Sequence, residues 1–381
     1  MKELKLVLSA VRRAVFGVEF LAEDPPSCWE KACSLAKAHD LSSVVLEGFA
    51  EQIVPPSVTE QLLRRSAASL ASYYAQNEAM ERLTKTLAQN GIDYLPLKGA
   101  VLRYLYPNPE WRVGRDVDVL VRPSDFDRAR QIATAVLSPV KIGEGRHDVG
   151  FTCSDGVRIE LHFSLFNGDE GFGDLLSDPF AHAILKAEHR YELPDAELYA
   201  YHLAHMAKHF RHGGCGLRAF LDLYLLRQSL SSEALADAEA LLVTAGLDQF
   251  AAVAWRQSRV FFAGELGDAD TERLGRFVAR NQAFGSFRSV AAAQAHKKEK
   301  KHGFCAVWAR AFPSYRNMCY LYPVLRCWPV LLPFCWIARG FRLFSKKDRD
   351  RFVAATRAAS RVGDTQVEEM AEIYQYLKLE G

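Results

Sequence analysis

At residue 91 the spacing of the apolar residues changes, and with it the kind of structure that the sequence favours. From residue 2 to residue 90 apolar residues recur at intervals of three and four, as on one face of an α-helix. Pro55 and Pro56 indicate the start of a helix, and Gly91 indicates its end. From Ile92 onward, short apolar runs and alternation replace this pattern, so strands are expected there.

The stretch from 92 to 165 predicts a small unit that mixes strands and helices. In chain order we expect a strand over 92–97, helical turns over 100–106, a strand over 116–122, a helix from 124 to about 137, and a hairpin of strands 148–153 and 157–165. The hairpin turn is Ser154-Asp155-Gly156, because Asp-Gly suits a tight turn with a positive φ. Beyond residue 167 we expect helices until the end of the chain.

These patterns predict an α+β fold, in which a mixed sheet is flanked by large N- and C-terminal helical regions. The expected parts are an N-terminal helical region at 1–90, a mixed core at 91–166 and a C-terminal helical domain at 167–381. The chain has 49% hydrophobic and 25% charged residues, which is the composition of a folded soluble protein and excludes a disordered or collagen-like chain.

Charge and cysteine content narrow the classes of protein further. The 48 basic and 46 acidic residues leave a net charge of +2, which gives no global reason to expect a nucleic-acid partner. The eight cysteines form no CxxC pair, so we expect reduced thiols in a cytoplasmic protein rather than a zinc ribbon. Arg12 and Arg13 interrupt the first apolar stretch, which argues against a signal peptide. The apolar residues 320–344 are broken by prolines and arginines, so a buried helix pair is expected, with a peripheral membrane contact as the alternative.

Two acidic residues lie on one face of the second expected strand. In DVDVLV the alternation places Asp116 and Asp118 on one face, and Val117, Val119 and Val121 on the other. Such a pair can bind Mg²⁺, which prefers oxygen ligands, or it can simply lie on a solvated strand.

The second strand of the hairpin adds a third acid. Alternation over 157–165 places Glu160 and His162 together on the polar face. If this strand pairs beside the aspartate strand, Glu160 can bind a metal or accept a proton from an attacking hydroxyl. The alternative is an exposed hairpin face with Glu160 and His162 in water.

Basic residues ahead of the aspartates indicate a place for phosphate. Gly99 allows close backbone approach at the start of a helix, and Lys98 supplies a positive charge for an anion such as a triphosphate. The alternative is a simple turn between strand and helix. Arg112 and Arg115 could balance phosphate charge as well, or could pair with the carboxylates.

Four histidines fall close to one face of a later helix, at His202, His205, His209 and His212. Histidine commonly binds metals, but no HExxH pattern accompanies these residues. Packing of this face against the core is therefore favoured over a zinc site. The histidines expected at the pocket of the site are His205 and His209 of this helix and His162 of the hairpin.

Taken together, these elements resemble a known family. The segments YLPLKGAVLRYLYPNPEWRVGRDVDVLVRPSDFDRA, GVRIELHFSLF and YHLAHMAKHFRHGGCGLRAFLDLYLL are similar to the uncharacterised bacterial nucleotidyltransferases of the DNA polymerase beta-like superfamily. The resemblance implies a minimal nucleotidyltransferase sheet in which Asp116 and Asp118 hold metal ions and Glu160 completes the site. The usual Gly-Ser phosphate-binding turn of the superfamily is represented here by Lys98-Gly99.

The resemblance implies an enzyme that uses Mg²⁺ or Mn²⁺ to move a nucleoside monophosphate from a nucleoside triphosphate to a hydroxyl, with release of pyrophosphate. ATP is the expected donor, and a small molecule, a peptide or a protein is the expected acceptor. A nucleic-acid acceptor is less favoured because the chain has no RNA-binding motif. The alternative is a catalytically inactive module of the same fold that binds nucleotide or a partner protein.

Overall fold

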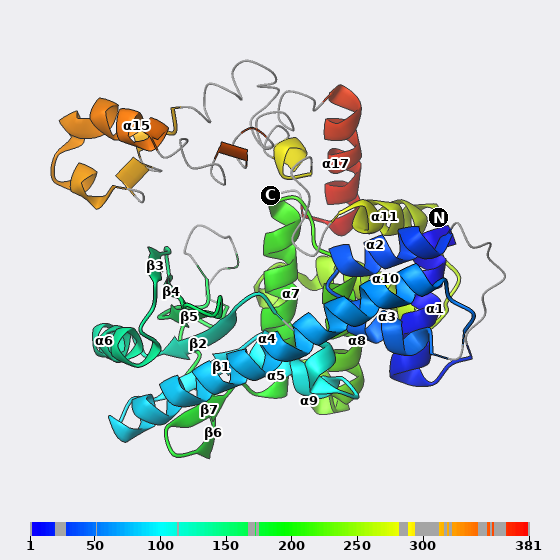
Figure 1. The fold of residues 1–381 in the computed structure, drawn as a ribbon, viewed down its shortest axis with the longest axis horizontal. Coiled ribbons are helices and arrows are strands. Elements are labelled where there is room, and N and C mark those ends of the chain that lie inside the picture. The colour runs from blue at the N-terminus through cyan, green and yellow to red at the C-terminus, as the bar shows by residue number, and fades with distance from the viewer. Residues whose placement is uncertain are drawn as a thin grey trace. The chain divides into compact units, whose positions relative to one another are not determined.

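The computed structural model describes residues 2–19, 28–50, 52–112, 114–166, 172, 175–281, 289–293, 312–315, 318–319, 322–341, 349–350, 353 and 363–379 (Figure 1). The chain divides into two compact units, Met1–Met206 with Gly216–Ala279, and Ala207–Cys215 with Arg280–Gly381. These units follow the packing of the chain, whereas the three parts expected from the sequence follow changes of secondary structure.

The N-terminal region is helical, as predicted. Its helices are α1 (Lys2–Phe16), α2 (Trp29–Ala38), α3 (Ser42–Gly48) and α4 (Pro56–Gln89). Helix α4 starts with a proline, which lacks only an N–H that the first turn would leave unpaired, and ends before Gly91 with its φ of +66°. Helices α1 and α3 approach closely at Gly48, where a Cβ atom would lie 2.0 Å from the carbonyl oxygen of Ala10. Only glycine fits at this contact.

The described residues form a mixed sheet of seven strands, which confirms the expected α+β class. The strands are β1 (Tyr94–Leu97), β2 (Val117–Val121), β3 (Lys141–Glu144), β4 (Asp148–Thr152), β5 (Arg158–His162), β6 (Ile184–Ala187) and β7 (Arg190–Glu192). Their order across the sheet is β3-β4-β5-β2-β1-β7-β6. Strand β2 is antiparallel to β1 and parallel to β5, so the aspartate strand lies beside the second hairpin strand.

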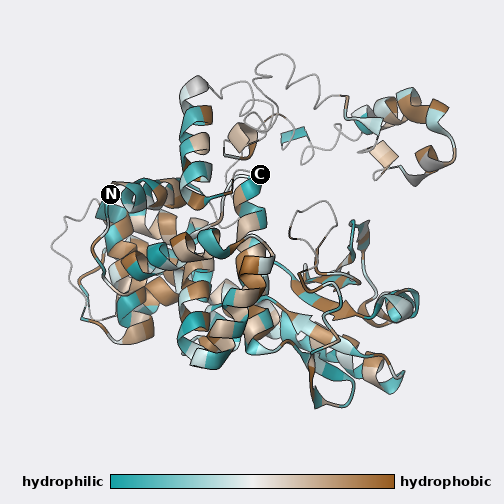
Figure 2. Cartoon of the chain, turned by 180° about the vertical axis from the view of Figure 1, so that it is seen from behind, coloured by the Kyte–Doolittle hydropathy of each residue, from teal (hydrophilic) through white to brown (hydrophobic). Residues whose placement is uncertain are grey.

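One face of this sheet is apolar and is covered by α4 and α6 (Phe126–Leu137). The valines of β2 belong to the buried cluster on this face, together with Leu83 of α4 and Ala133 of α6. Figure 2 shows brown, hydrophobic segments within this sheet. Because strand residues alternate between faces, Asp118 points to the opposite face of the sheet.

The turn between β4 and β5 has the predicted form. Gly156 has a φ of +88°, and the Asp155 carboxylate accepts the backbone N–H of Val157 at 3.0 Å. This turn sets the register of the hairpin, in which Asp148 lies opposite His162.

The prediction of helices alone after residue 167 is wrong. Strands β6 and β7 form a second hairpin, and β7 continues the sheet in parallel with β1, with Arg190 opposite Tyr94. Strand β3 was not predicted either. Each of these strands has only three or four residues, and β3 and β6 are exposed along their whole length, so no alternation of apolar and polar residues marks them.

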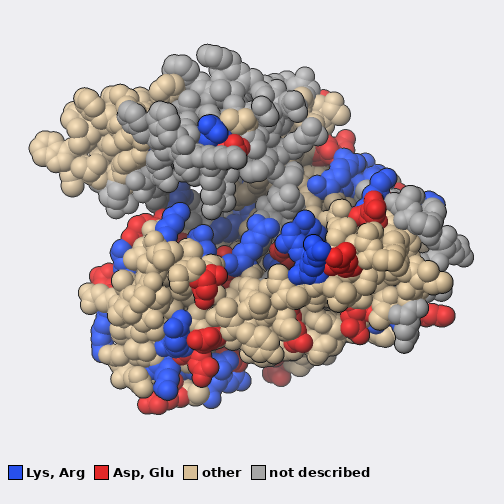
Figure 3. All heavy atoms as spheres, viewed as in Figure 1, with Lys and Arg blue, Asp and Glu red and all other residues tan. Residues whose placement is uncertain are grey.

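The later part of the chain is otherwise helical where it is described. Its helices include α7 (Asp195–Arg211), α8 (Leu217–Ser229), α9 (Ser232–Thr244), α10 (Asp248–Phe262), α11 (Ala269–Arg280), α15 (Leu332–Phe341) and α17 (Asp364–Leu377). On the face that Figure 3 presents, basic and acidic side chains are mixed, in keeping with the net charge of +2. None of the seven described cysteines forms a disulfide.

The apolar stretch 320–344 differs from the buried helix pair that was expected. Its described part contains α15 and two short 3-10 turns, Pro323–Arg326 and Pro329–Leu331. Phe334 and Ile337 of α15 are 67% and 58% exposed, so the helix is not buried. None of the helices in the described part of the chain is both long and apolar enough to span a membrane.

Candidate active site

The two central strands bring an aspartate and a glutamate together. In the parallel pair of β2 and β5, Asp118 is the register partner of Glu160, and Leu120 is the partner of His162. Side chains at paired positions of neighbouring strands lie on the same face of a sheet. Strand pairing therefore places two of the predicted acids and His162 on the face opposite the apolar core.

Asp118 is the centre of this group. Its side chain is 2% exposed, and its Oδ1 atom accepts hydrogen bonds from Lys98 Nζ at 2.9 Å and from His162 Nε2 at 2.8 Å. Both bonds go to Oδ1, and neither uses Oδ2. Burial disfavours the charged carboxylate, but the Lys98 charge and the His162 hydrogen bond outweigh it and hold the pKa of Asp118 well below its usual value.

The other two acids have pKa values shifted in the opposite direction. Asp116 immediately precedes β2, and its pKa is raised by burial and by the charge of Asp118. The pKa of Glu160 is raised by burial and by the charges of both aspartates. Arg158, which is 51% exposed, contacts Glu160 Oε1 at 2.6 Å. Three carboxylates thus repel one another in one place, which is the electrostatic setting that a bound cation relieves.

The backbone of Lys98 has a conformation that residues other than glycine rarely adopt. It lies between the end of β1 and the short helix α5 (Gly99–Leu102), with φ +46° and ψ −114°. Such a conformation costs about 1–3 kcal/mol and persists where the surroundings fix it. Here the ammonium is bonded to Asp118. Burial lowers the pKa of Lys98, but the Asp118 charge outweighs this effect and raises it.

Gly99 lies against two arginines. A Cβ atom at this position would meet Nη1 of Arg112 at 2.8 Å, and the carbonyl of Gly99 accepts a hydrogen bond from Arg103 Nε at 2.8 Å. Arg103 is almost fully buried and also donates to Asn77 of α4 at 2.7 Å. Buried guanidinium groups of Arg103 and Arg112 therefore contact the turn that follows β1 and fix its position.

Two groups of side chains in the described residues could hold a metal ion. The first is Asp118, Glu160 and His162, and the second is His147, Asp148 and His162; within each group the ligand atoms lie within 4.8 Å of one another. Asp116 was predicted as a metal ligand and belongs to neither group. His162 was predicted only as a pocket residue, and it belongs to both.

The family described as uncharacterised nucleotidyltransferase matches residues 25–262, which include helices α2 to α4, the whole sheet and helices α7 to α10. The chain belongs to this family. As a family member it is a nucleotidyltransferase, that is, a transferase. Comparison with curated proteins gives no match.

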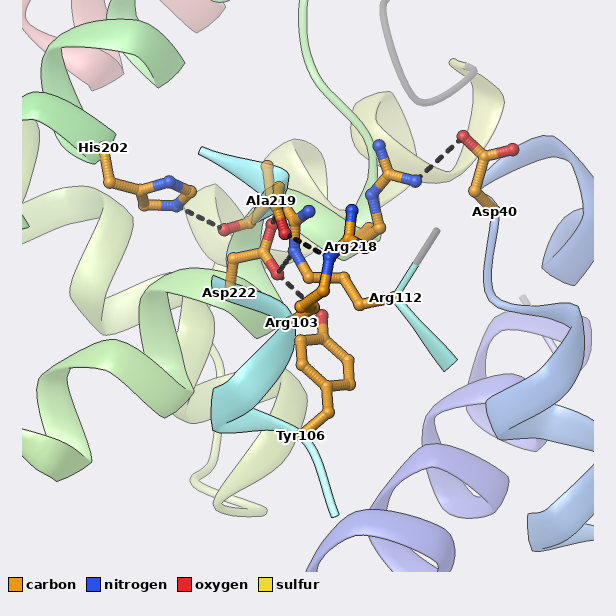
Figure 4. A network of polar contacts seen from close by, with 9 residues as sticks. Asp40, Arg103, Tyr106, Arg112, His202, Arg218, Ala219 and Asp222 are labelled. Carbon is orange, nitrogen blue, oxygen red and sulfur yellow. Dashed lines mark hydrogen bonds and ion pairs between the residues drawn. The ribbon is translucent and has the colours of Figure 1, made fainter. Parts of the chain in front are cut away.

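In this nucleotidyltransferase, Arg112 is engaged away from the carboxylates. Its guanidinium donates two hydrogen bonds to Asp222 of α8, Nε to Oδ1 and Nη2 to Oδ2, both at 2.8 Å (Figure 4). Tyr106 donates its hydroxyl to the same carboxylate at 2.7 Å. Burial opposes the charges, but each partner offsets it, so the pKa of Arg112 is raised and that of Asp222 is lowered. Arg115 is exposed.

The histidines of α7 have separate surroundings. His202 is buried and its Nε2 donates to the carbonyl of Ala219 at 3.0 Å (Figure 4), and burial lowers its pKa. The ring of His205 lies 6.2 Å from that of Tyr201, and His209 belongs to the second unit. Neither candidate metal group among the described residues of the nucleotidyltransferase includes a histidine of α7.

His147, Asp148 and Arg158 of the nucleotidyltransferase were not predicted as site residues. A signal for Asp148 was present. The Asp155-Gly156 turn sets Thr152 opposite Arg158, and counting four residues back along β4 and four forward along β5 then sets Asp148 opposite His162. Alternation also places Arg158 on the polar face of β5 with Glu160, so a signal for Arg158 was present as well. His147 gave no such signal, because it lies outside the strand pattern.

Proposed function

We propose that this nucleotidyltransferase transfers a nucleoside monophosphate from ATP to a hydroxyl of a small-molecule, peptide or protein acceptor and releases pyrophosphate. The observation that carries the proposal is the register of β2 and β5, which pairs Asp118 with Glu160 beside Asp116 in a chain of nucleotidyltransferase family. Hard divalent cations prefer oxygen ligands such as the carboxylates that these neighbouring strands bring together.

The donor set fits a hard divalent cation such as Mg²⁺ or Mn²⁺. Asp118 and Glu160 offer carboxylate oxygens within 4.8 Å of each other, and the raised pKa values of Asp116 and Glu160 reflect negative charge that a cation would offset. Asp116, Asp118 and Glu160 would hold the ion. When bound, it would neutralise charge on the phosphate oxygens and on the leaving pyrophosphate.

The phosphates of the donor would be held by the turn after β1 and by exposed basic residues. Lys98 supplies an ammonium at the carboxylates, and Gly99 follows it as the first residue of α5. We assign Arg115 and Arg158 to the same task, because both side chains reach solvent. Arg112, buried against Asp222, instead supports Gly99 from behind.

The reaction needs one proton acceptor. The acceptor hydroxyl oxygen would attack the α-phosphorus, a new P–O bond would form, and the bond from the α-phosphorus to the oxygen that bridges to the β-phosphate would break. Glu160 would take the hydroxyl proton on the carboxylate oxygen that does not bind the ion, since its side chain is 14% exposed and can meet an acceptor from solvent.

Thermal unfolding of the full chain with each of the four nucleoside triphosphates, with and without Mg²⁺, tests the donor site. At a hundredfold excess over Kd, a ligand raises the free energy of unfolding by about 2.7 kcal/mol. We expect a Mg²⁺-dependent rise with ATP that is lost in Asp118→Asn and kept in Asp127→Asn, a matched change on the exposed first turn of α6.

Transfer itself is measured by following the label of ATP marked at the α-phosphate, together with pyrophosphate release, in the presence of candidate hydroxyl acceptors. Glu160→Gln should retain nucleotide binding and lose transfer. Stabilisation by nucleotide without any transfer would contradict the enzyme and favour the inactive binding module, and a nucleotide effect that Asp118→Asn retains would contradict the site.

A further inference from the structure

The second group of potential metal ligands lies on the hairpin side of His162. Asp148 is the register partner of His162 in the antiparallel pair of β4 and β5, and His147 precedes β4. The ladder continues past these residues, since the backbone N–H of Phe163 donates to the carbonyl of His147 at 3.0 Å. The rings of His147 and His162 lie 5.3 Å apart.

The hydrogen bond to Asp118 fixes the tautomer of His162. A carboxylate only accepts, so Nε2 carries the hydrogen, and in the neutral ring Nδ1 is left with a lone pair. The ring is 3% exposed, and Nδ1 is a buried atom with no hydrogen-bond partner among the described residues. Buried acceptors are rarely left without a partner, because the loss costs about 1–3 kcal/mol.

A metal ion would provide that partner. Proteins commonly orient a metal-binding histidine by a hydrogen bond from its other ring nitrogen to a carboxylate, which is the contact that His162 makes with Asp118. His147 Nδ1 and Asp148 Oδ1 are 3.9 Å apart, whereas two ligands of a tetrahedral zinc ion lie roughly 3.4 Å apart. A small movement of the two side chains toward each other would let both atoms bind the same ion.

The ligand set also indicates the kind of ion. Two imidazoles and one carboxylate suit late first-row metals such as Zn²⁺, in contrast to the carboxylates that suit Mg²⁺. The side chains of His147 and Asp148 are 14% and 16% exposed, so an ion and its bound water can reach them from solvent.

We propose that His147, Asp148 and His162 form a second, transition-metal site that takes Zn²⁺. The site shares His162 with the carboxylate group through the bond to Asp118. An ion on Nδ1 withdraws electrons from the ring, strengthens the hydrogen bond that Nε2 donates to Asp118, and so fixes the orientation of that carboxylate. The proposal stands on the second ligand group and does not depend on nucleotide transfer.

The test is titration of the metal-free full chain with Co²⁺, followed by its visible absorption, and with Zn²⁺, followed by calorimetry. Excess Mg²⁺ is present throughout, so that the carboxylates are occupied. We expect one equivalent to bind, and His147→Gln and Asp148→Asn each to weaken binding by about tenfold or more. His182→Gln is the matched control, because His182 contacts Glu197 at 2.8 Å but is 76% exposed and belongs to neither metal group.

Two further variants separate this proposal from the proposed function. Asp116→Asn should lose the nucleotide effect and keep Co²⁺ binding, since Asp116 is not in the second group. Thermal unfolding of each metal-free variant verifies that it folds. Co²⁺ binding that survives both His147→Gln and Asp148→Asn, or that is lost only in Glu160→Gln, would place the ion at the carboxylates and overturn the proposal.

Discussion

Arg112 and Asp222 form a two-point ion pair although 110 residues separate them in the chain. Their side chains are 7% and 3% exposed, so water contributes little to the stabilisation of either charge. The pair connects the segment that precedes Asp116 and Asp118 to helix α8, and the same guanidinium lies against Gly99.

Removal of one charge of this pair should be costly. Asp222→Asn leaves Arg112 buried and uncompensated, and we expect a loss of about 3–5 kcal/mol in the free energy of unfolding. Tyr106→Phe removes one hydrogen bond from the same carboxylate and should cost about 1–3 kcal/mol. Urea unfolding of both variants provides the comparison, and equal losses would show that the charge itself contributes nothing.

The close approach of Gly99 to Arg112 makes a second prediction. Gly99→Ala introduces a Cβ atom 2.8 Å from Nη1 of Arg112, whose position is fixed by Asp222, so the turn must shift. Overpacking of this kind costs about 1–3 kcal/mol. Gly143→Ala on β3, where a Cβ atom would meet nothing within 4 Å, is the control and should change stability far less. The free energy of unfolding in urea and the stabilisation by nucleotide should both decrease in Gly99→Ala and stay nearly unchanged in Gly143→Ala.

At Lys98, the effect of the strained backbone can be separated from the effect of the ammonium charge by two substitutions. Both Lys98→Ala and Lys98→Gly remove the ammonium from Asp118, but only glycine adopts the φ of +46° without strain. Lys98→Gly should therefore be more stable than Lys98→Ala by about 1–3 kcal/mol. Both should bind triphosphate more weakly than the natural chain. A stability order with Ala above Gly would show that the turn relaxes once the ammonium is gone.

His39 predicts how stability depends on pH. It is fully buried, its Nδ1 accepts the backbone N–H of Leu217 at 3.2 Å, and burial lowers its pKa from 6.5 to about 4. As pH falls below about 6.5 the unfolded chain takes up a proton that the folded chain refuses, so the free energy of unfolding decreases by about 1.4 kcal/mol per pH unit until about pH 4.

This contribution is fully present above about pH 6.5 and amounts to about 3 kcal/mol. Urea unfolding at a series of pH values measures it, and His39→Gln should have a shallower slope than the natural chain over this window. Parallel slopes for the two proteins would assign the pH dependence to other groups.

Local signals in the sequence were sufficient for the elements around the site. Asp155-Gly156 determined the β4–β5 turn, and alternation in DVDVLV separated Asp118 from the valines that pack under α4 and α6. Both features depend on residues that are adjacent in the sequence, so they can be predicted from the sequence alone.

Contacts between distant segments could not be predicted in the same way. Nothing near Arg112 indicates that its partner is Asp222, and strand β7 pairs with β1 across almost a hundred residues, through a single register pair of Tyr94 and Arg190. The proximity of the His147 ring, just before β4, to the His162 ring on β5 likewise depends on the side-chain rotamers of both residues. Such contacts are selected by the packing of the whole chain, and no short pattern encodes them.

The pairing of Arg112 with Asp222 also has a consequence for synthesis on the ribosome. The chain emerges from its N-terminus, so β1, Gly99 and both aspartates are made before Asp222 exists. Until α8 emerges, the guanidinium behind Gly99 lacks its counter-charge, and the turn lacks a fixed support. The strands that carry the acids are therefore not an autonomous unit, and we expect nascent chains to acquire nucleotide binding only after α8 has left the exit tunnel.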